Sequence, residues 1–251
     1  QHQGSRKHLG DKEGQQKAVK TLENRGLEGL VVIGGDGSFR AARDLSDGFG
    51  VPTIGIPGTI DNDLEYTDYT LGFDTAVNTC LDIINKLRDT MTSHERISVV
   101  EVMGRHCGDI ALFSGIASGA EIIVVPEITF DMDDIVMKIN RSRASGKHSN
   151  IIVVAEGVMS AEQFARQLQD VTTYSVRPTC IGHVQRGGSP SMADRMLAAQ
   201  FGNKAVRLLN EGVGNRAVGI RKNEIIDMDI IEAVSMKKKF NYELYETLQM
   251  I

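Results

Sequence analysis

The chain of 251 residues is 41% apolar and 24% charged, which is typical of a globular protein with one large or two small domains. Its formal net charge of -5 argues against nucleic acid or an anionic membrane as the main partner and favours a small molecule. Three cysteines without a CxxC spacing indicate neither a disulfide framework nor a zinc site, and they predict a cytoplasmic protein. The sequence contains no apolar run of transmembrane length and no signal-peptide core.

Short β-branched runs alternate with longer stretches of helical periodicity along the chain. The predicted strands cover residues 30–33, 53–56, 97–102, 121–126, 150–157, 180–184 and 217–220. The predicted helices cover roughly 12–23, 38–47, 73–91, 107–118, 131–145, 161–170 and 191–211. This alternation predicts parallel sheets with crossover helices, and the continuous apolar strands indicate sheets that are covered on both faces.

The first candidate site is the GGDGS sequence that follows the strand at 30–33. Gly35, Gly37 and Ser38 would let backbone N–H groups approach a polyphosphate at the start of a helix. Asp36 could hold a magnesium ion that bridges phosphates. A tight strand-to-helix turn explains the same residues equally well. The sequence lacks the GxxxxGK[ST] and GxGxxG patterns in the required context, which disfavours two common nucleotide-binding folds.

The second candidate site is PGTIDND, residues 57–63, which follows the strand at 53–56. The Pro-Gly pair predicts a stiff turn, and Asp61 and Asp63 would lie at the carboxyl edge of the sheet. Open α/β sheets bind their ligands at this edge. The alternative is a solvated turn that uses Asp and Asn for local backbone hydrogen bonds.

Three more strand ends carry residues that could bind an oxyanion or a sugar. Gly104 and Arg105 combine backbone donors with a guanidinium group. Glu156 could accept sugar hydroxyl protons, and His183 with Arg186 could recognise a phosphate. Each set also has a structural explanation: a solvated arginine, a capping carboxylate and a structural histidine.

Two further arginines, Arg96 and Arg177, stand just before predicted strands, at the opposite strand edge from these sites. If they bind an anion, we expect them to do so across a subunit boundary.

Together, the motifs GGDGS, PGTIDND, SHERISVVEVMGR, AEG and GHVQRGGSP closely resemble, in this order and spacing, the ATP-dependent 6-phosphofructokinases of bacterial type. The match runs from about Gly14 to the end of the chain, and PGTIDND combined with GHVQRGGSP is highly specific. The resemblance implies a glycolytic kinase that transfers the γ-phosphoryl group of Mg-ATP to the 1-hydroxyl of fructose 6-phosphate, giving fructose 1,6-bisphosphate.

The resemblance also implies an α/β fold of two similar three-layer αβα lobes with mostly parallel sheets. Residues 1–72 with 186–239 would form the ATP-binding lobe, and residues 73–185 with 240–251 would form the fructose 6-phosphate-binding lobe. The active sites would lie in the cleft between the lobes and be completed by a neighbouring subunit of a homotetramer.

The resemblance assigns the residues that act on the substrates. Asp61 would be the general base, supported by Thr59, Asp63 and Arg105, and Asp36 would hold the magnesium ion. The sugar phosphate would contact Thr59, Asp61, Met103, Gly104, Arg105, Glu156, His183 and Arg186 of one subunit, and Arg96 and Arg177 of its neighbour. ATP would contact Gly35, Asp36, Gly37, Ser38 and Arg6.

Two glycines bear on the phosphoryl donor. Pyrophosphate-using relatives carry Asp at the position of Gly37 and Lys at the position of Gly58. An aspartate would crowd and repel the α-phosphate of ATP, so the two glycines favour ATP.

The resemblance further implies an effector pocket with Arg88, Glu121 and Lys147. Ser145 stands where relatives usually carry Lys or Arg. We therefore expect a weakened response to ADP or phosphoenolpyruvate.

The family's first glycine-rich strand-turn-helix block, which forms part of the ATP site, has no counterpart in this sequence. The chain also lacks an initiator methionine, so we expect it to begin inside a longer protein. If these residues were the whole polypeptide, loss of a central strand would predict poor stability and little activity.

Three alternatives to this kinase differ in what the motifs would have to do. The first is a silent subunit or fragment that binds sugar phosphate without turnover. The second, which is less favoured, is a pyrophosphate-dependent phosphofructokinase. A lipid or NAD kinase would not supply PGTIDND together with GHVQRGGSP.

Overall fold

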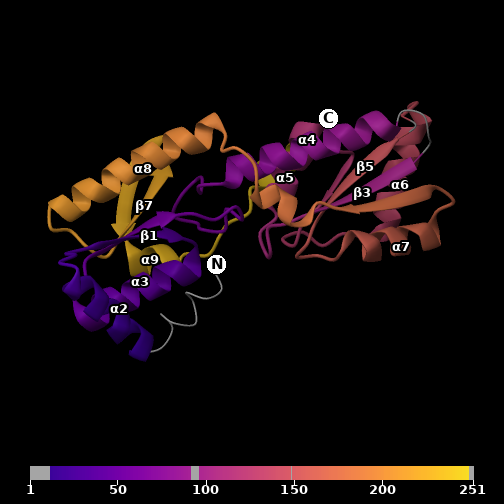
Figure 1. The fold of residues 1–251 in the computed structure, drawn as a ribbon. Helices are drawn as coiled ribbons and strands as arrows, with labels where there is room; N and C mark the ends of the chain where they lie inside the picture. Colours follow the sequence, from indigo (N-terminus) through magenta and orange to yellow (C-terminus); the bar gives the residue numbers. More distant parts are fainter. Residues whose placement is uncertain (1–11, 92–95, 148, 249–251) are drawn as a thin grey trace. The chain divides into compact units, whose positions relative to one another are not determined.

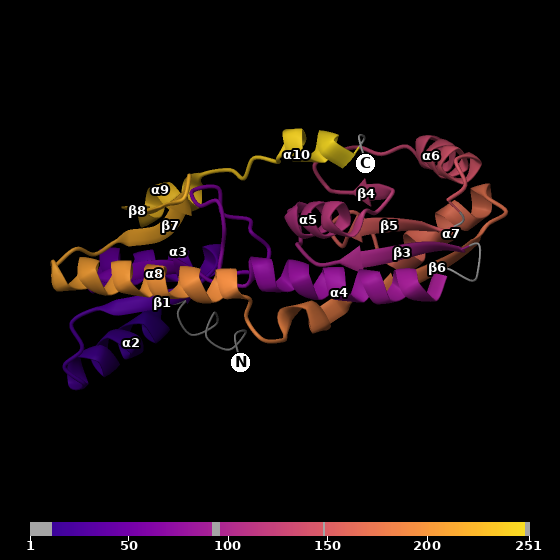
Figure 2. The ribbon, with the colours of Figure 1, turned by 90° about the horizontal axis from the view of Figure 1, so that it is seen from above.

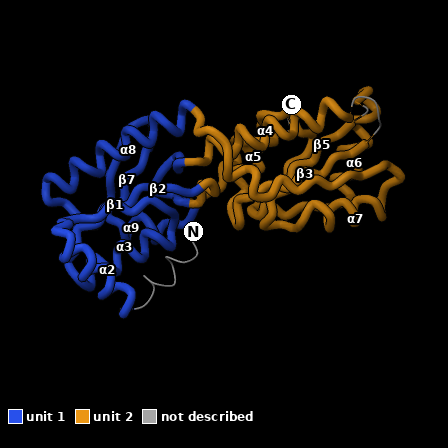
Figure 3. Tube along the Cα trace, in the orientation of Figure 1, with its two compact units in different colours: residues 1–59, 64–71, 192–238 blue, residues 60–63, 72–191, 239–251 orange. Residues whose placement is uncertain are grey.

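The computed structural model describes residues 12–91, 96–147 and 149–248 (Figure 1). Contacts divide the chain into two compact units (Figure 3). Unit 1 comprises Gln1–Thr59, Leu64–Leu71 and Met192–Lys238, and unit 2 comprises Ile60–Asp63, Gly72–Ser191 and Lys239–Ile251. The lobes predicted from the sequence have nearby boundaries, although Ile60–Asp63 falls in unit 2. The substrate assigned to each lobe stays a prediction.

Unit 1 contains a four-stranded sheet in the order β1-β2-β7-β8, in which only β8 is antiparallel to its neighbour. Its strands are β1 (Leu30–Gly34), β2 (Thr53–Pro57), β7 (Arg216–Arg221) and β8 (Glu224–Asp229). Its helices are α2 (Lys12–Asn24), α3 (Asp36–Phe49), α8 (Met192–Asn210) and α9 (Ile230–Ser235).

Alternating side chains give unit 1 two apolar cores, one on each face of its sheet. Ile54 and Ile56 of β2 pack with Phe201 of α8, whereas Phe39 of α3 packs with Ala217 of β7 and with residues of α9. In Figure 1, α8 lies above this sheet and α3 and α9 lie below it. Burial on both faces explains why every residue of β2 is buried and why the strand is largely apolar.

Unit 2 contains a wholly parallel sheet in the order β4-β5-β3-β6. Its strands are β3 (Arg96–Val102), β4 (Ile122–Val124), β5 (Asn150–Ala155) and β6 (Ser175–Cys180). Its helices are α4 (Phe73–Met91), α5 (Asp109–Ser118), α6 (Met132–Ala144), α7 (Ala161–Val171), the 3₁₀ helix η1 (Gly182–Arg186) and α10 (Tyr242–Thr247).

The sheet of unit 2 is also covered on both faces. Val100 and Val102 of β3 face a core built with α4, α5 and α10, and Ile97 and Val99 face a core built with α6 and α7. Figure 2 shows these helices around the sheet from a second direction. The predicted α/β fold with two three-layer, mostly parallel lobes is therefore confirmed.

One predicted strand is wrong. The strand expected at 180–184 lies instead at Ser175–Cys180, and residues 182–186 form η1. Among the described residues β6 pairs with β3 alone and is an edge strand, so it accepts exposed polar residues and Pro178, and its sequence does not read as a buried strand. Gly182, with φ of +57°, turns the chain into η1. Strand β8 and helices α9 and α10 were not predicted.

None of the helices in the described part of the chain combines the length and apolar character that a membrane crossing requires.

Candidate active site

The carboxyl ends of three parallel strands gather one group of predicted site residues in unit 2. Val102 of β3 pairs with Ala155 of β5, and Glu101 of β3 pairs with Cys180 of β6. The segments that follow these strands therefore leave the sheet at the same edge, which is the ligand-binding edge of open α/β sheets. These segments carry Met103, Gly104, Arg105, Glu156, His183 and Arg186.

The turn after β3 has an unusual backbone. Gly104 has φ of +132° and Arg105 has φ of +53°, a region that residues other than glycine rarely occupy. A Cβ atom on Gly104 would lie 2.4 Å from the carbonyl oxygen of Cys107, so this position requires glycine. Such strain persists only where the surroundings hold the backbone in place.

Residues after β5 hold this turn. The backbone N–H of Arg105 donates to Oε1 of Glu156 at 3.0 Å, and the backbone N–H of Glu156 donates to the carbonyl of Val102 at 2.8 Å. A Cβ atom on Gly157 would lie 1.8 Å from the carbonyl oxygen of Arg105. The turn therefore packs directly on the backbone at Gly157, where no side chain fits.

Asp61 lies against the same turn. Nε of Arg105 lies 3.4 Å from Oδ2 of Asp61, and the side chains are 52% and 4% exposed, respectively. Burial raises the pKa of Asp61 most, and the negative charge of Asp63 raises it further. The positive charges of Arg105 and Arg186 lower this pKa and the charge of Glu156 raises it, so that the net shift is upward. Asp61 is thus a poorly solvated carboxylate, and its affinity for a proton is above normal.

The residue between the two aspartates supports this geometry. Asn62 is buried with φ of +52°, and its Nδ2 donates to Oδ2 of Asp109 at 2.8 Å, in the first turn of α5. The thiol of Cys107 donates to the carbonyl of Asn62 at 3.9 Å. The sequence prediction attributed the turn to Pro57 and Gly58 and missed Asn62. The readiness of asparagine to adopt left-handed conformations was the available signal.

The third segment, η1, presents an imidazole and a guanidinium outward. His183 and Arg186 are exposed, whereas Gln185 between them is buried. Nε of Arg186 lies 3.4 Å from Sδ of Met103, and the backbone N–H of Met103 donates to Oε1 of Gln185 at 3.0 Å. These contacts join η1 to the turn after β3. Gln185 had no assigned role in the sequence prediction.

The remaining two arginines lie away from this edge. Arg96 was expected just before a strand and is instead the first residue of β3, and Arg177 is the third residue of β6 and does not precede a strand. The sequence prediction placed Arg177 before the strand because it misplaced β6. In register, Arg96 pairs with Ser175 and Arg177 pairs with Ser98. The structure does not bring either arginine to the carboxyl edge of the sheet.

The predicted nucleotide residues lie in unit 1, where β1 passes into α3. Gly35 precedes the helix, and Asp36, Gly37 and Ser38 form its first turn. The N-terminus of α3 therefore offers backbone N–H groups and a positive dipole end to an anion. Thr59 follows β2 in the same unit, and its carbonyl accepts a hydrogen bond from the hydroxyl of Thr70 at 2.6 Å. Arg6 lies outside the described residues.

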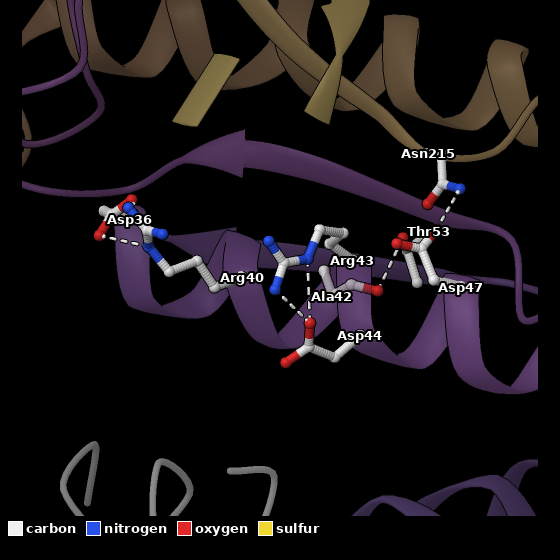
Figure 4. A network of polar contacts seen from close by, with 8 residues as sticks. All are labelled: Asp36, Arg40, Ala42, Arg43, Asp44, Asp47, Thr53 and Asn215. Carbon is white, nitrogen blue, oxygen red and sulfur yellow. Dashed lines mark hydrogen bonds and ion pairs between the residues drawn. The ribbon is translucent and has the colours of Figure 1, made fainter. Parts of the chain in front are cut away.

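Asp36 is the predicted magnesium ligand. Nε of Arg40, one turn further along α3, donates to Oδ1 of Asp36 at 3.1 Å and to Oδ2 at 3.0 Å. Figure 4 shows these two side chains joined at the start of the helix. The hydroxyl of Thr53 in β2 donates to the carbonyl of Ala42 in α3 at 3.3 Å, and the same figure shows this contact between the strand and the helix. No group of three or more His, Cys, Asp or Glu residues in the described part of the chain could hold a metal. One half-exposed carboxylate fits a magnesium ion that takes its other ligands from phosphates and water.

Comparison with known proteins identifies the family. Residues 3–209 match the sequence model of the family described as Phosphofructokinase. The chain belongs to the phosphofructokinase family. The resemblance found in its motifs is thereby confirmed.

Several relatives of this phosphofructokinase are similar over most of the chain. ATP-dependent 6-phosphofructokinase from Clostridium tetani is 60% identical over 93% of this chain and 73% of the relative. The enzyme of the same name from Clostridium acetobutylicum is 55% identical over 94% of this chain and 74% of the relative.

Solved structures agree on the fold of this phosphofructokinase. The phosphofructokinase structure from Saccharomyces cerevisiae matches with a TM-score of 0.86 and 29% identity over 97% of this chain. The present chain spans only 36% of that yeast chain. A pyrophosphate-dependent phosphofructokinase from Marinobacter aquaeolei has a TM-score of 0.80 over 93% of this chain and 66% of that chain, but at 22% identity it supports the fold alone.

A separate cavity of about 470 Å³ in unit 2 of this phosphofructokinase contains two of the predicted effector residues. Glu121 and Lys147 line it together with Lys138 and Arg141 of α6. Nζ of Lys147 lies 3.7 Å from Oε1 of Glu121. Arg88 does not line the cavity; its Nη2 donates to the carbonyls at the C-terminal end of α5. Ser145 also lines the cavity.

Proposed function

We propose that this chain transfers the γ-phosphoryl group of Mg-ATP to the 1-hydroxyl of fructose 6-phosphate, giving fructose 1,6-bisphosphate. One observation carries the proposal: Asp61 is buried, has a raised pKa and faces Arg105 at the carboxyl edge of a parallel sheet. An ATP-dependent 6-phosphofructokinase is also 60% identical to this chain over 93% of the chain's length.

Asp61 would act as the general base. Its raised pKa brings the carboxylate closer to the operating pH, which makes it a stronger base than an exposed aspartate. The charge of Arg105 opposes this shift, which favours the ionised form of Asp61 that can accept a proton. The half-exposed guanidinium of Arg105 would also contact the transferred phosphoryl group, where negative charge spreads over the oxygens.

The other residues at this edge would bind fructose 6-phosphate. Oε1 of Glu156 accepts the Arg105 N–H, so Oε2 would be directed to a sugar hydroxyl. His183 and Arg186 are exposed on η1 and would bind the 6-phosphate. Arg96 and Arg177 lie elsewhere on the sheet and would serve the site of a neighbouring subunit in a homotetramer. The polar turn of Met103 to Arg105 would contact the sugar ring.

The start of α3 would bind the phosphates of ATP through Gly35, Gly37 and Ser38, with Asp36 at the magnesium ion. Bound magnesium would neutralise charge on the β- and γ-phosphates. Gly58 supports ATP over pyrophosphate as the donor: a Cβ atom there would lie 2.8 Å from Cγ2 of Ile33, so a lysine would require Ile33 to move.

The cavity beside Lys147 would bind an anionic effector such as ADP or phosphoenolpyruvate. Lys138, Arg141 and Lys147 supply positive charge there, and Glu121 opposes it. Ser145 would leave the response weaker than in relatives that carry a basic residue at this position. None of the three cysteines, all of which lie in the described part of the chain, forms a disulfide bond, which is consistent with a cytoplasmic enzyme.

The proposal is tested by product formation from fructose 6-phosphate and magnesium, with either ATP or pyrophosphate as the donor. Coupling to aldolase detects fructose 1,6-bisphosphate directly and so reports transfer to the 1-hydroxyl. We expect product with ATP and none with pyrophosphate. Product with pyrophosphate alone would overturn the donor assignment, and sugar binding without product from either donor would support a silent chain.

A further inference from the structure

Gln185 is a buried polar residue in an otherwise exposed helix. It is 1% exposed, whereas His183 and Arg186 on the same 3₁₀ turn are exposed. A buried carboxamide is costly unless its polar atoms are hydrogen-bonded. The position of Gln185 is therefore explained by the contacts that it makes.

Three hydrogen bonds satisfy the Gln185 side chain. Oε1 accepts from the backbone N–H of Met103 at 3.0 Å and from the thiol of Cys80 at 3.3 Å. Nε2 donates to the carbonyl of Gly182 at 2.9 Å. Burial raises the pKa of Cys80 to about 12, so this thiol keeps its proton and remains a donor. One side chain thus joins the turn after β3, helix α4 and helix η1.

These joined segments carry residues proposed above to hold the sugar phosphate. Met103 begins the turn that continues to Arg105, and Arg186 follows Gln185 directly. The contact between Nε of Arg186 and Sδ of Met103, at 3.4 Å, lies beside the Gln185 bonds. The relative position of the two segments therefore depends on Gln185.

We propose that Gln185 is a positioning residue for fructose 6-phosphate, which holds the turn after β3 and the cationic face of η1 at the separation that one sugar phosphate requires. This inference rests on the proposed function. Gln185 itself does not contact the substrate and acts through Met103, Arg105 and Arg186.

The side-chain chemistry explains why glutamine is suited to this position. A carboxamide can accept hydrogen bonds through its oxygen and donate them through its nitrogen at the same time. The Gln185 side chain does both, since Oε1 accepts from Met103 and Cys80 and Nε2 donates to Gly182. Gln185→Met keeps the approximate volume and removes the hydrogen bonds. Gln185→Glu keeps the shape, but the ionised carboxylate cannot donate to the carbonyl of Gly182. A protonated glutamic acid can donate there while its other oxygen accepts from Met103.

The test measures the affinity of the chain for fructose 6-phosphate by calorimetry, in parallel with its affinity for Mg-ATP and its thermal unfolding. We expect Gln185→Met to weaken fructose 6-phosphate binding by about tenfold or more and to leave Mg-ATP binding within about twofold. Gln169→Met is the matched control. Gln169 also joins a helix to backbone, since it accepts from the N–H of Val176 and donates to the carbonyl of Thr172, but it lies on α7. Its replacement should change neither affinity beyond about twofold.

Gln185→Glu supplies a pH readout. The ratio of its dissociation constant to that of the wild type should be near one at about pH 5.5 and should rise to about tenfold by about pH 8, because the carboxyl loses its proton. The titratable or charged side chains on the joined segments include Cys80 on α4, Arg105 on the turn after β3, and His183 and Arg186 on η1, and Glu156 and Asp61 in turn contact Arg105. Both proteins contain these groups, so the ratio isolates residue 185.

The outcomes separate the inference from the function. If the wild type and Gln185→Met bind fructose 6-phosphate with equal affinity, the inference is overturned and the proposed function remains intact. Equal losses of sugar and ATP affinity also overturn it, because they indicate general damage. If Gln185→Met does not fold, a flat pH ratio for Gln185→Glu overturns the inference. No binding of fructose 6-phosphate to the wild type contradicts the proposed function itself.

Discussion

Asp61 combines features that an exposed aspartate in a turn would not have. It is buried, Asp63 is close enough to raise its pKa, and Arg105 holds one of its oxygens. The sequence predicted Asp61 through its motif and its place after a strand. The buried state and the support from Asn62 could not be predicted, because they depend on α5, which lies more than forty positions further along the chain.

Replacing Asp61 should separate activity from stability. Asp61→Asn removes the base, so we expect turnover to fall about 10²- to 10⁴-fold. The folded pKa of Asp61 is raised, so its carboxyl contributes stability below the unfolded pKa that is lost as pH rises through the folded pKa. At about pH 7 the variant should therefore melt at a higher temperature than the wild type, and the difference should shrink as the pH falls toward the unfolded aspartate pKa of about 3.9.

The control for this comparison is Asp170→Asn, an exposed carboxylate of α7. It should alter neither the turnover nor the melting temperature. A lower melting temperature for Asp61→Asn at about pH 7 would contradict the assigned cost of burying Asp61.

Arg105 should control the acid limb of the pH profile. Activity should be lost as pH falls through the raised pKa of Asp61, because the protonated base cannot accept the hydroxyl proton. The charge of Arg105 lowers that pKa, so Arg105→Gln should move the acid limb of kcat/KM to higher pH, in addition to reducing its maximum. The measurement is kcat/KM for fructose 6-phosphate against pH. An acid limb that stays in place, or moves to lower pH, would show that Arg105 does not act on the base.

At the scale of elements, the site depends on how three strand ends meet. The alternation of short apolar runs with stretches of helical periodicity was sufficient to predict most helices and strands, because most buried strands of both sheets are largely apolar. β6 was misplaced because an edge strand such as SVRPTC tolerates polar side chains and Pro178. Gln185 was missed because its partners, Cys80 and Met103, come from two distant elements.

The packing of Glu156 and Gly157 on the turn after β3 gives an element-scale prediction. Gly157→Ala places a Cβ atom 1.8 Å from the carbonyl oxygen of Arg105, so the turn must shift. We expect kcat/KM for fructose 6-phosphate to fall about tenfold or more, while KM for Mg-ATP stays within about twofold. Steady-state kinetics with each substrate varied in turn will measure this difference.

Gly202→Ala is the matched control, because a Cβ atom on Gly202 in α8 would have no neighbour within 4 Å. This control should retain activity and gain up to about 1 kcal/mol of stability from its better helix propensity. Normal sugar kinetics in Gly157→Ala would rule out the proposed role of this contact.

At the scale of the whole molecule, the proposed function assigns the two substrates to separate units. Asp36 and the start of α3 belong to unit 1, and Asp61, Arg105 and η1 belong to unit 2. The motifs were sufficient to predict two lobes. They could not predict that Ile60–Asp63 groups with unit 2, because the chain crosses between the units several times and contacts decide where each segment belongs.

Hydrogen exchange should distinguish the two units. Fructose 6-phosphate should slow exchange in residues 103–105 and 182–186, and a non-hydrolysable ATP analogue should slow it in residues 35–38. Ligand binding stabilises the elements that it contacts, so protection reports the site occupied. Protection of 35–38 by fructose 6-phosphate alone would contradict the assignment of the substrates.

The most direct measurement is ADP formation from Mg-ATP with and without fructose 6-phosphate, using the chain beside its Asp61→Ser variant. The account predicts turnover that depends on the sugar and falls at least about 10²-fold in the variant. Turnover that persists undiminished in Asp61→Ser would show that Asp61 is not the base. Absence of sugar-dependent turnover in the unmodified chain, with fructose 6-phosphate bound, would contradict the claim that this chain carries out the transfer.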